Sequence, residues 1–251
     1  MSKIFHDIPV ERQIARHMQW WERRREEWQR QAHATLRQPA GKSGPYLSIS
    51  RALGSGGSEI AKSLAEKLGW QLFDREIIEA IAGRMHAREE LVASFDEHIQ
   101  NQMDTYLRNL LTKQLLDNTQ YLHHLTKVLL GIAQHGCAVI VGRGANMILP
   151  LEAGLRVRVV APMEVRLRRL MQEIGCDEKS AAHETRQRDE EQRAFIQHHF
   201  RCKPDDPCAY DVVINTGLID PGAATDFIIH LAEAKLKTLG FKLSTKEVSV
   251  L

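Results

Sequence analysis

A glycine-rich segment that begins near residue 51 carries the residue types of a loop that binds phosphate. The letters read YLSIS-RALGSGGS-EIAKSLAEKLGW, which is a short β-branched run, a glycine-rich loop and an amphipathic helix. In the pattern G-x-x-x-x-G-K-[ST], backbone N–H groups and a lysine hold the phosphates of a nucleotide. Gly56 matches the second glycine and Ser58 the hydroxyl residue, whereas Arg51 and Gly57 stand where the first glycine and the lysine are expected. The loop therefore keeps a backbone cradle for phosphate and lacks the usual lysine.

The residues on both sides of this loop favour a phosphate site over a flexible surface turn. Residues 46–50 read as a buried strand, and the apolar residues after the loop recur at helical spacing until Gly69. A helix that begins where a glycine loop ends directs free N–H groups and the positive end of its dipole at the loop. We therefore expect the phosphates of a nucleotide to bind here.

Charged residues follow two other predicted strands. Asp74 and Arg75 come directly after the strand at residues 71–73, and Arg143 follows the apolar run CAVIV between two glycines. Parallel sheets bind ligands beyond the carboxyl ends of their strands, and a guanidinium can bind a phosphate through two hydrogen bonds. The sequence therefore predicts that these side chains meet a substrate, with an incidental surface turn as the alternative at Arg143.

A late predicted helix, residues 176–200, carries two arginines on one face. Arg186 and Arg193 are seven residues apart, and Glu190 lies between them. Cations on such a helix can neutralise the charge that develops when a phosphoryl group is transferred. The alternative is an ordinary solvated helix face, which is what most charged stretches of this kind form.

The elements that must position these residues alternate along the chain. Short apolar runs separated by helical patterns predict an α/β fold with a parallel sheet that is covered on both faces. Helices are expected over residues 77–85, most of 88–134, the segment after Pro162, residues 176–200 and residues 221–239. The predicted strands are residues 46–50, 71–73, 137–141, 155–161 and 211–215.

The first 44 residues form a separate predicted unit, an amphipathic helix and a linker, in front of the α/β domain at residues 45–251. Apolar residues recur near a 3.6-residue period between Pro9 and about Arg37, and residues 38–45 read as the linker. Arginines and glutamates alternate on the helix, which argues against a membrane surface. We expect the apolar stripe to pack on the domain or to form a homodimer.

Composition and charge exclude several classes of protein. The 251 residues contain 34 Lys and Arg against 32 Asp and Glu, so the formal net charge of +2 argues against nucleic acid as the partner. No apolar run approaches the roughly 20 residues that span a bilayer, and the opening letters MSKIFHDIPVERQ lack the apolar core of a signal peptide. We therefore expect a cytoplasmic protein without a membrane partner.

The four cysteines, at positions 137, 176, 202 and 208, show no C-x-x-C pair, which is typical of reduced thiols. His198, His199, Cys202 and Cys208 fall in one short stretch and contain the ligand types of zinc. Their spacing is irregular, so a polar segment without metal is the preferred interpretation.

Taken in order along the chain, these segments resemble the cytidylate kinase-like family, a branch of the nucleoside monophosphate kinases. The similarity runs from about Pro45 to the end, and its most specific part is S-R-x-x-G-S-G-G-x-E-I-A. The other matching segments are FDREII, VGRGANMIL, VRVVAPMEVRLRRLM, RQRDEEQR and YDVVINT.

The resemblance implies a P-loop kinase fold with a five-stranded parallel core and a helical lid. It also implies transfer of the γ-phosphate of ATP to CMP or dCMP with Mg²⁺. The resemblance places the acceptor at Asp74 and Arg143 and lid contacts at Arg186, Glu190 and Arg193. The residues that it places around the ATP phosphates are Gly54, Ser55, Gly56, Gly57 and Ser58, with the Ser58 hydroxyl facing Mg²⁺.

The chain departs from the family pattern at positions that matter for catalysis. Gly57 replaces the lysine, Val141 and Gly144 replace the two aspartates of D-G-R-D, and Ala80 replaces an acceptor-binding arginine. We expect Arg51 to supply a substitute cation. Three functions stay open: a nucleoside monophosphate kinase, a nucleotide-binding regulatory module without turnover, and a nucleic-acid or partner-binding arm formed by the N-terminal helix.

Overall fold

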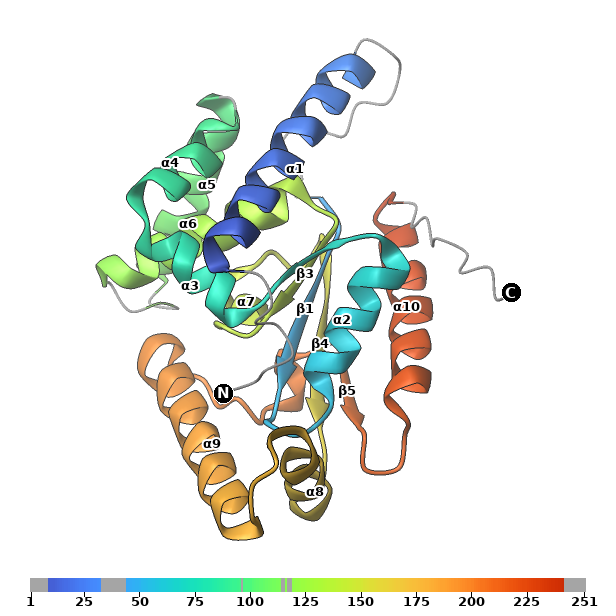
Figure 1. Ribbon diagram of the computed structural model, residues 1–251. Helices are drawn as coiled ribbons and strands as arrows, with labels where there is room; N and C mark the ends of the chain where they lie inside the picture. Colours follow the sequence, from blue (N-terminus) through green and yellow to red (C-terminus); the bar gives the residue numbers. More distant parts are fainter. Residues whose placement is uncertain (1–8, 33–43, 96, 114–115, 117–118, 242–251) are drawn as a thin grey trace.

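Five parallel strands form one sheet at the centre of the molecule, in the order β2-β3-β1-β4-β5 (Figure 1). This architecture comes from a computed structural model, which describes residues 9–32, 44–95, 97–113, 116 and 119–241. The predicted parallel α/β fold is confirmed, and each predicted strand is found within one residue of its expected ends. The strands are β1 (Tyr46–Arg51), β2 (Gln71–Phe73), β3 (Ala138–Val141), β4 (Gly154–Val160) and β5 (Val212–Asn215).

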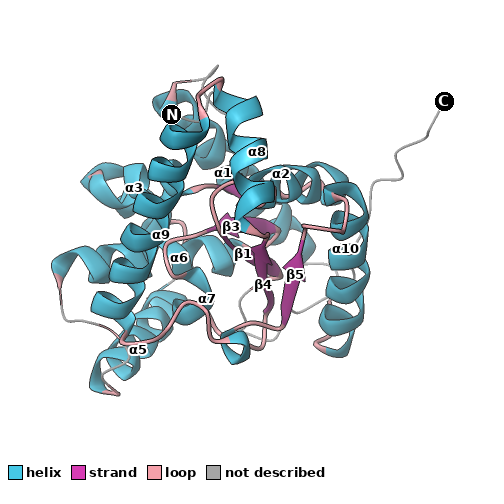
Figure 2. Ribbon diagram, turned by 90° about the horizontal axis from the view of Figure 1, so that it is seen from below, coloured by secondary structure: helices cyan, strands magenta, loops and turns pink. Residues whose placement is uncertain are grey.

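Helices cover both faces of this sheet, which explains why its strands are continuous apolar runs. On one face, α2 (Gly57–Leu68) and α10 (Pro221–Thr238) pack on alternate strand residues such as Leu47 and Ile49. The opposite face carries the helices between β2 and β3, which pack on Tyr46 and Phe73. Figure 2, viewed from below Figure 1, shows the sheet lying between these two layers.

The described residues between 75 and 135 contain four helices, where the sequence predicts a helix and then a long, largely helical stretch. Arg84 has an extended backbone, with φ −101° and ψ 113°, so the predicted helix at residues 77–85 ends early and a new one begins. Asp74 and Thr119 cap the first and last of these helices through their side chains. The helices are α3 (Arg75–Gly83), α4 (Met85–Ala93), α5 (Glu97–Thr112) and α6 (Gln120–His135).

The carboxyl ends of the strands point toward the lower part of Figure 1, where α8 and α9 lie beyond the sheet. Asp177 caps α9, so this helix begins two residues later than the sequence predicts. The short helix α7 (Ala145–Ile148) follows β3, and the short element η2 (Pro207–Ala209) leads into β5. The long ones are α8 (Met163–Ile174) and α9 (Glu178–Phe200).

The first half of the N-terminal helix, α1 (Val10–Ala32), packs against the α/β domain. Ile14 is buried, the His17 ring stacks on Phe73 with centroids 4.3 Å apart, and Arg84 pairs with Glu11 at 2.7 Å. Packing on the domain is therefore one use of the apolar stripe, while a homodimer stays a prediction.

Val10 and Met18 of the same stripe also pack against the domain. The side chains of Trp21 and Trp28, farther along the helix, and all of residues 33–43 lie outside the described part of the structure. Within the described residues, no helix combines the length and the apolar character that crossing a membrane requires.

Candidate phosphate and acceptor site

The glycine-rich loop forms a tight turn between β1 and α2. Gly54 and Gly56 have positive φ angles of 74° and 76°, which favour glycine. A Cβ atom on Gly54 would lie 2.5 Å from the backbone oxygen of Arg166, so no side chain fits there. No side chain caps the N-terminus of α2, whose first N–H groups are therefore available to an anion in the loop.

The side chain of Arg51 occupies the space next to Gly57. A Cβ atom on Gly57 would lie 2.6 Å from Cβ and 3.3 Å from Cδ of Arg51. Nε of Arg51 donates a hydrogen bond to Oγ of Ser58 at 2.7 Å. Arg51 and a lysine at position 57 therefore exclude each other, and in this chain the cation comes from the strand before the loop.

Burial lowers the pKa of Arg51, and the negative charge of Asp74 opposes that shift. An arginine remains protonated under any physiological condition, so the loop contains a partly buried positive charge. Such a charge is costly without an anion, which makes this position suitable for a phosphate group.

On the other side of Arg51, Arg143 lies at the carboxyl end of β3, as the sequence predicts. Its Nη2 pairs with Glu79 at 2.5 Å, its Nη1 donates to the Tyr121 hydroxyl at 3.4 Å, and its guanidinium carbon lies 5.0 Å from the centre of the Phe195 ring. Burial lowers the pKa of Arg143, and Glu79 opposes that shift. Glu79, Tyr121 and Phe195 are contacts that the sequence did not identify.

Asp74 and Arg75 also lie at this edge, where each has a partner within the protein. The Asp74 carboxylate accepts a hydrogen bond from the N–H of Ile77 at 2.9 Å and so caps α3. Arg75 is exposed and pairs with Glu79 at 3.6 Å. Their contact with an acceptor stays a prediction.

The three predicted residues of the lid helix, Arg186, Glu190 and Arg193, are all exposed on α9. Arg193 has a long ion pair of 3.9 Å with Asp205. Their contact with a substrate stays a prediction. It requires α9 to move toward the phosphate loop.

A buried ion pair that the sequence did not identify fixes α9 to the phosphate loop. Arg166 of α8 makes two hydrogen bonds of 2.8 and 2.7 Å to Asp189 of α9. Nε of the same arginine donates to the backbone oxygen of Leu53 at 2.6 Å. Its position in the sequence could have indicated that Arg166 is buried, because it lies four residues before the buried Leu170 and so on the inward face of α8.

A second arginine of α8 connects the loop to the end of β5. Arg169 donates to Oγ1 and to the backbone oxygen of Thr216, both at 2.9 Å. The Thr216 hydroxyl donates to the backbone oxygen of Ser55 at 2.6 Å. Nη1 of Arg169 lies 3.4 Å from the position of a Cβ atom on Gly56, so this cation also borders the phosphate loop.

The zinc alternative has no support in the described residues, among which no group of three or more His, Cys, Asp and Glu is arranged to hold a metal ion. Cys202 and Cys208 are exposed free thiols. Magnesium is a different case, because the hydroxyl of Ser58 already accepts a hydrogen bond from Arg51. A magnesium ion on this oxygen requires Arg51 to turn away first.

Comparison with known proteins shows the family of the chain. Residues 46–218 match the cytidylate kinase-like family. A cytidylate kinase of Archaeoglobus fulgidus is 26% identical over 190 residues, which cover 75% of this chain and 95% of that protein. A cytidylate kinase of Halobacterium salinarum is 24% identical over 188 residues, or 75% of this chain and 89% of that one.

Among solved structures, an uncharacterized protein from Eubacterium ventriosum has a similar fold, with a TM-score of 0.54 and 22% identity. That match covers 76% of this chain and 99% of the other. The family match covers β1 to β5 and includes the glycine loop, Arg143 and the lid helix. On this match, the chain belongs to the cytidylate kinase-like family.

Proposed function

We propose that the protein is a nucleotide phosphotransferase that moves the γ-phosphoryl group of ATP to a nucleoside monophosphate, with CMP or dCMP as the acceptor. The observation that carries the proposal is the open N-terminus of α2 with the partly buried guanidinium of Arg51 beside it. Membership of the cytidylate kinase-like family supports a kinase-like phosphotransferase of this kind.

In this reaction, Gly54 to Ser58 hold the phosphates of ATP with backbone N–H groups, and Arg51 provides the positive charge. An oxygen of the acceptor phosphate attacks the γ-phosphorus, and the bond from that phosphorus to the β,γ-bridging oxygen breaks to release ADP. Positive charge that is already in place lowers the barrier to such a transfer.

The acceptor is expected on the side of Arg143, with Asp74, Arg75 and Glu190 as further contacts. Arg143 is held by Glu79, so an acceptor phosphate must compete with this carboxylate for the guanidinium. Arg186 and Arg193 are exposed and reach the phosphates when α9 moves toward the loop. This movement is part of the proposal.

Magnesium enters this scheme with the phosphates of ATP, which supply oxygen ligands that the ion prefers. Ser58 can add its hydroxyl once Arg51 has turned from Ser58 to a phosphate. The ion's role is to neutralise charge on the phosphates, and the residues of this chain position them.

The alternative is a regulatory module that binds a nucleotide without turnover. It is favoured by Gly57 in place of the lysine and by Val141 and Gly144 in place of the two aspartates. Both functions use the phosphate loop to bind a nucleotide, and they differ only in whether the phosphoryl group is transferred. One experiment therefore separates the two.

The test is incubation of the full chain with ATP, Mg²⁺ and a panel of nucleoside monophosphates, with ADP formation measured for each acceptor. The kinase proposal predicts ADP formation that depends on CMP or dCMP and is lost in Arg143→Ala. ATP binding in a parallel titration without ADP formation would instead establish the regulatory module. Absence of both binding and turnover would contradict both proposals.

A further inference from the structure

Two arginines near the phosphate loop are equally buried but differ in how their charges are balanced. The side chains of Arg158 and Arg166 are each 8% exposed. Arg166 has the two short hydrogen bonds to Asp189 described above. Arg158 has only a 3.4 Å contact with Asp205, whose side chain is 67% exposed.

The other contacts of Arg158 are with uncharged groups. It donates to the Ser50 hydroxyl at 2.8 Å and lies 5.9 Å from the centre of the Tyr210 ring. When the Gln192 amide is oriented so that both its nitrogen and its oxygen have hydrogen-bond partners, its oxygen accepts from Nη1 of Arg158 at 3.3 Å. A buried cation is stable when an anion is close and well aligned, and the one ion pair of Arg158 among the described residues is the long, exposed hydrogen bond to Asp205.

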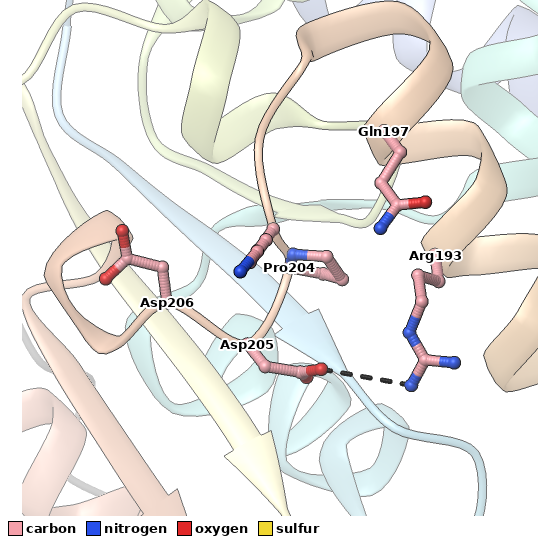
Figure 3. A pocket seen from close by; sticks show the side chains of 6 residues that line it. Arg193, Gln197, Pro204, Asp205 and Asp206 are labelled. Carbon is pink, nitrogen blue, oxygen red and sulfur yellow. Dashed lines mark ion pairs between the residues drawn. The ribbon is translucent and has the colours of Figure 1, made fainter.

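This arginine lies at the inner end of a hollow beneath α9. The outer part has a volume of about 370 Å³ and lies between Arg193 and Gln197 of α9 and the loop at residues 203–206 (Figure 3). A smaller part of about 80 Å³ shares Arg193 and Asp205 with the first and reaches Arg158 and Ala52. The outer part is within the size range of small-molecule sites.

The hollow lies on the opposite face of the sheet from the side chain of Arg51. Ser50 and Arg158 are neighbours in the register of β1 and β4 and point to one face, whereas Ile49 points to the face covered by α2. Arg51 contacts Gly57 at the start of α2. The two arginines therefore serve different positions, although Ala52 borders both the hollow and the phosphate loop.

We propose that Arg158 and Arg193 form a second anion site beneath the lid helix, for a small molecule that carries a phosphate or a carboxylate. Asp205 holds both cations loosely while the site is empty and is displaced by the ligand's anionic group. A ligand bound there joins β4 to α9, so it also holds the lid helix against the sheet. This inference is independent of turnover at the phosphate loop.

The test is calorimetric titration of the full chain with inorganic phosphate and, separately, with malonate, at saturating ADP so that the phosphate loop is filled. Asp205→Asn removes the competing carboxylate, so we expect it to bind these anions about tenfold more tightly than the wild type. Asp206→Asn is the matched control, because Asp206 lines the same hollow but caps η2 rather than touching Arg158. We expect less than about a twofold change for that control.

Equal affinities in Asp205→Asn and Asp206→Asn would overturn the proposal, as would anion binding that survives Arg158→Gln. If Arg158→Gln does not fold, the comparison of the two aspartate variants still decides. If the chain does not bind ADP, the titrations are repeated in Arg51→Ala, which weakens anion binding at the phosphate loop and leaves the second site intact.

A final titration with CMP identifies the source of the anion. A tenfold tighter CMP complex in Asp205→Asn would assign the site to the acceptor phosphate. An unchanged CMP affinity, beside tighter phosphate or malonate binding, would assign it to a separate small molecule. Both results support the second anion site.

Discussion

At the scale of single residues, the phosphate loop of this chain differs from the common pattern at two positions that are coupled in space. Position 57 has lost its side chain and position 51 has gained one, and the two side chains would occupy the same volume. The charge is therefore kept near the loop although its origin in the sequence has changed. On the proposed function, Arg51 supplies the charge that the lysine provides in the common pattern.

The coupling predicts the behaviour of a set of variants in the same ADP assay. Arg51→Ala should lower turnover by a factor of about 10²–10³, which is typical for loss of one charged donor. Adding Gly57→Lys to Arg51→Ala should not restore turnover, because alanine keeps the Cβ atom at position 51 and a Cβ atom at position 57 would lie 2.6 Å from it. The double variant Arg51→Gly with Gly57→Lys removes the clash and should recover part of the turnover.

A matched glycine tests the steric part of this argument by thermal unfolding. Gly57→Ala should lower the melting temperature, and adding Arg51→Gly should relieve that effect. Gly83→Ala is the control, because a Cβ atom on Gly83 would meet nothing within 4 Å. Equal melting temperatures for the two single alanine variants would show that position 57 is not crowded.

At the scale of elements, the lid helix α9 contacts the rest of the protein along its length, and two of these attachments can be tested separately. Asp189 near its middle binds Arg166 of α8, and Phe200 at its end packs against Gly144. Both attachments involve residues that border the candidate site, so a change in either one alters where the arginines of α9 lie. The ion pair of Asp189 and the packing of the Phe200 ring therefore both contribute to the position of the lid helix.

Asp189→Asn should weaken the first attachment, because it leaves the buried guanidinium of Arg166 without its carboxylate. We expect a loss of about 1–3 kcal/mol in the free energy of unfolding, measured by urea denaturation. The control is Glu191→Gln, an exposed carboxylate two residues away that pairs with Arg188 at 3.2 Å. That variant should change stability by less than about 0.5 kcal/mol. A neutral Asp189→Asn variant would show that the ion pair does not anchor α9.

Gly144→Ala tests the second attachment. Its Cβ atom would lie 2.4 Å from the Phe200 ring, and its φ of 67° is in the left-handed region. Gly175→Ala isolates the cost of the backbone, because Gly175 has the same φ and a Cβ atom there would meet nothing within 4 Å. We expect Gly144→Ala to lower the melting temperature further than Gly175→Ala. Equal decreases in melting temperature for the two variants would mean that the Phe200 ring can move aside without loss of stability.

At the scale of the whole molecule, the N-terminal helix is joined to the α/β domain by a histidine. His17 is 7% exposed and stacks on Phe73 at the end of β2, directly before Asp74. Burial lowers the pKa of His17 to about 4. The imidazole is therefore neutral in the folded protein near pH 7.

This shift predicts how stability depends on pH. The unfolded chain takes up a proton at His17 as the pH falls below about 6.5, whereas the folded protein does so only near pH 4. The contribution is fully present above pH 6.5 and is lost as the pH falls toward 4. His17→Gln should therefore flatten the decline of the melting temperature over this range, and the exposed His230→Gln should not. Parallel declines in the wild type and His17→Gln would contradict the assignment.

Local patterns in the sequence determined the elements of this fold and their order along the chain. Short continuous apolar runs located the five strands, and the glycine loop before a helical pattern located the candidate phosphate site. The position of Arg143 after an apolar run placed it at the carboxyl edge of a parallel sheet. These features depend on residues that are close in sequence, so propensity and periodicity are enough to predict them.

Only the tertiary structure decided which distant residues meet. The contacts of Thr216 with Ser55 and of Arg158 with Ser50 join residues more than 100 positions apart. Local sequence patterns also do not predict the strand order β2-β3-β1-β4-β5. The same is true of the ion pair between Arg166 and Asp189 and of the contact between the Arg51 side chain and Gly57. Such contacts arise when helices pack on a twisted sheet, because shape and charge, and not sequence separation, determine which close-packed side chains touch.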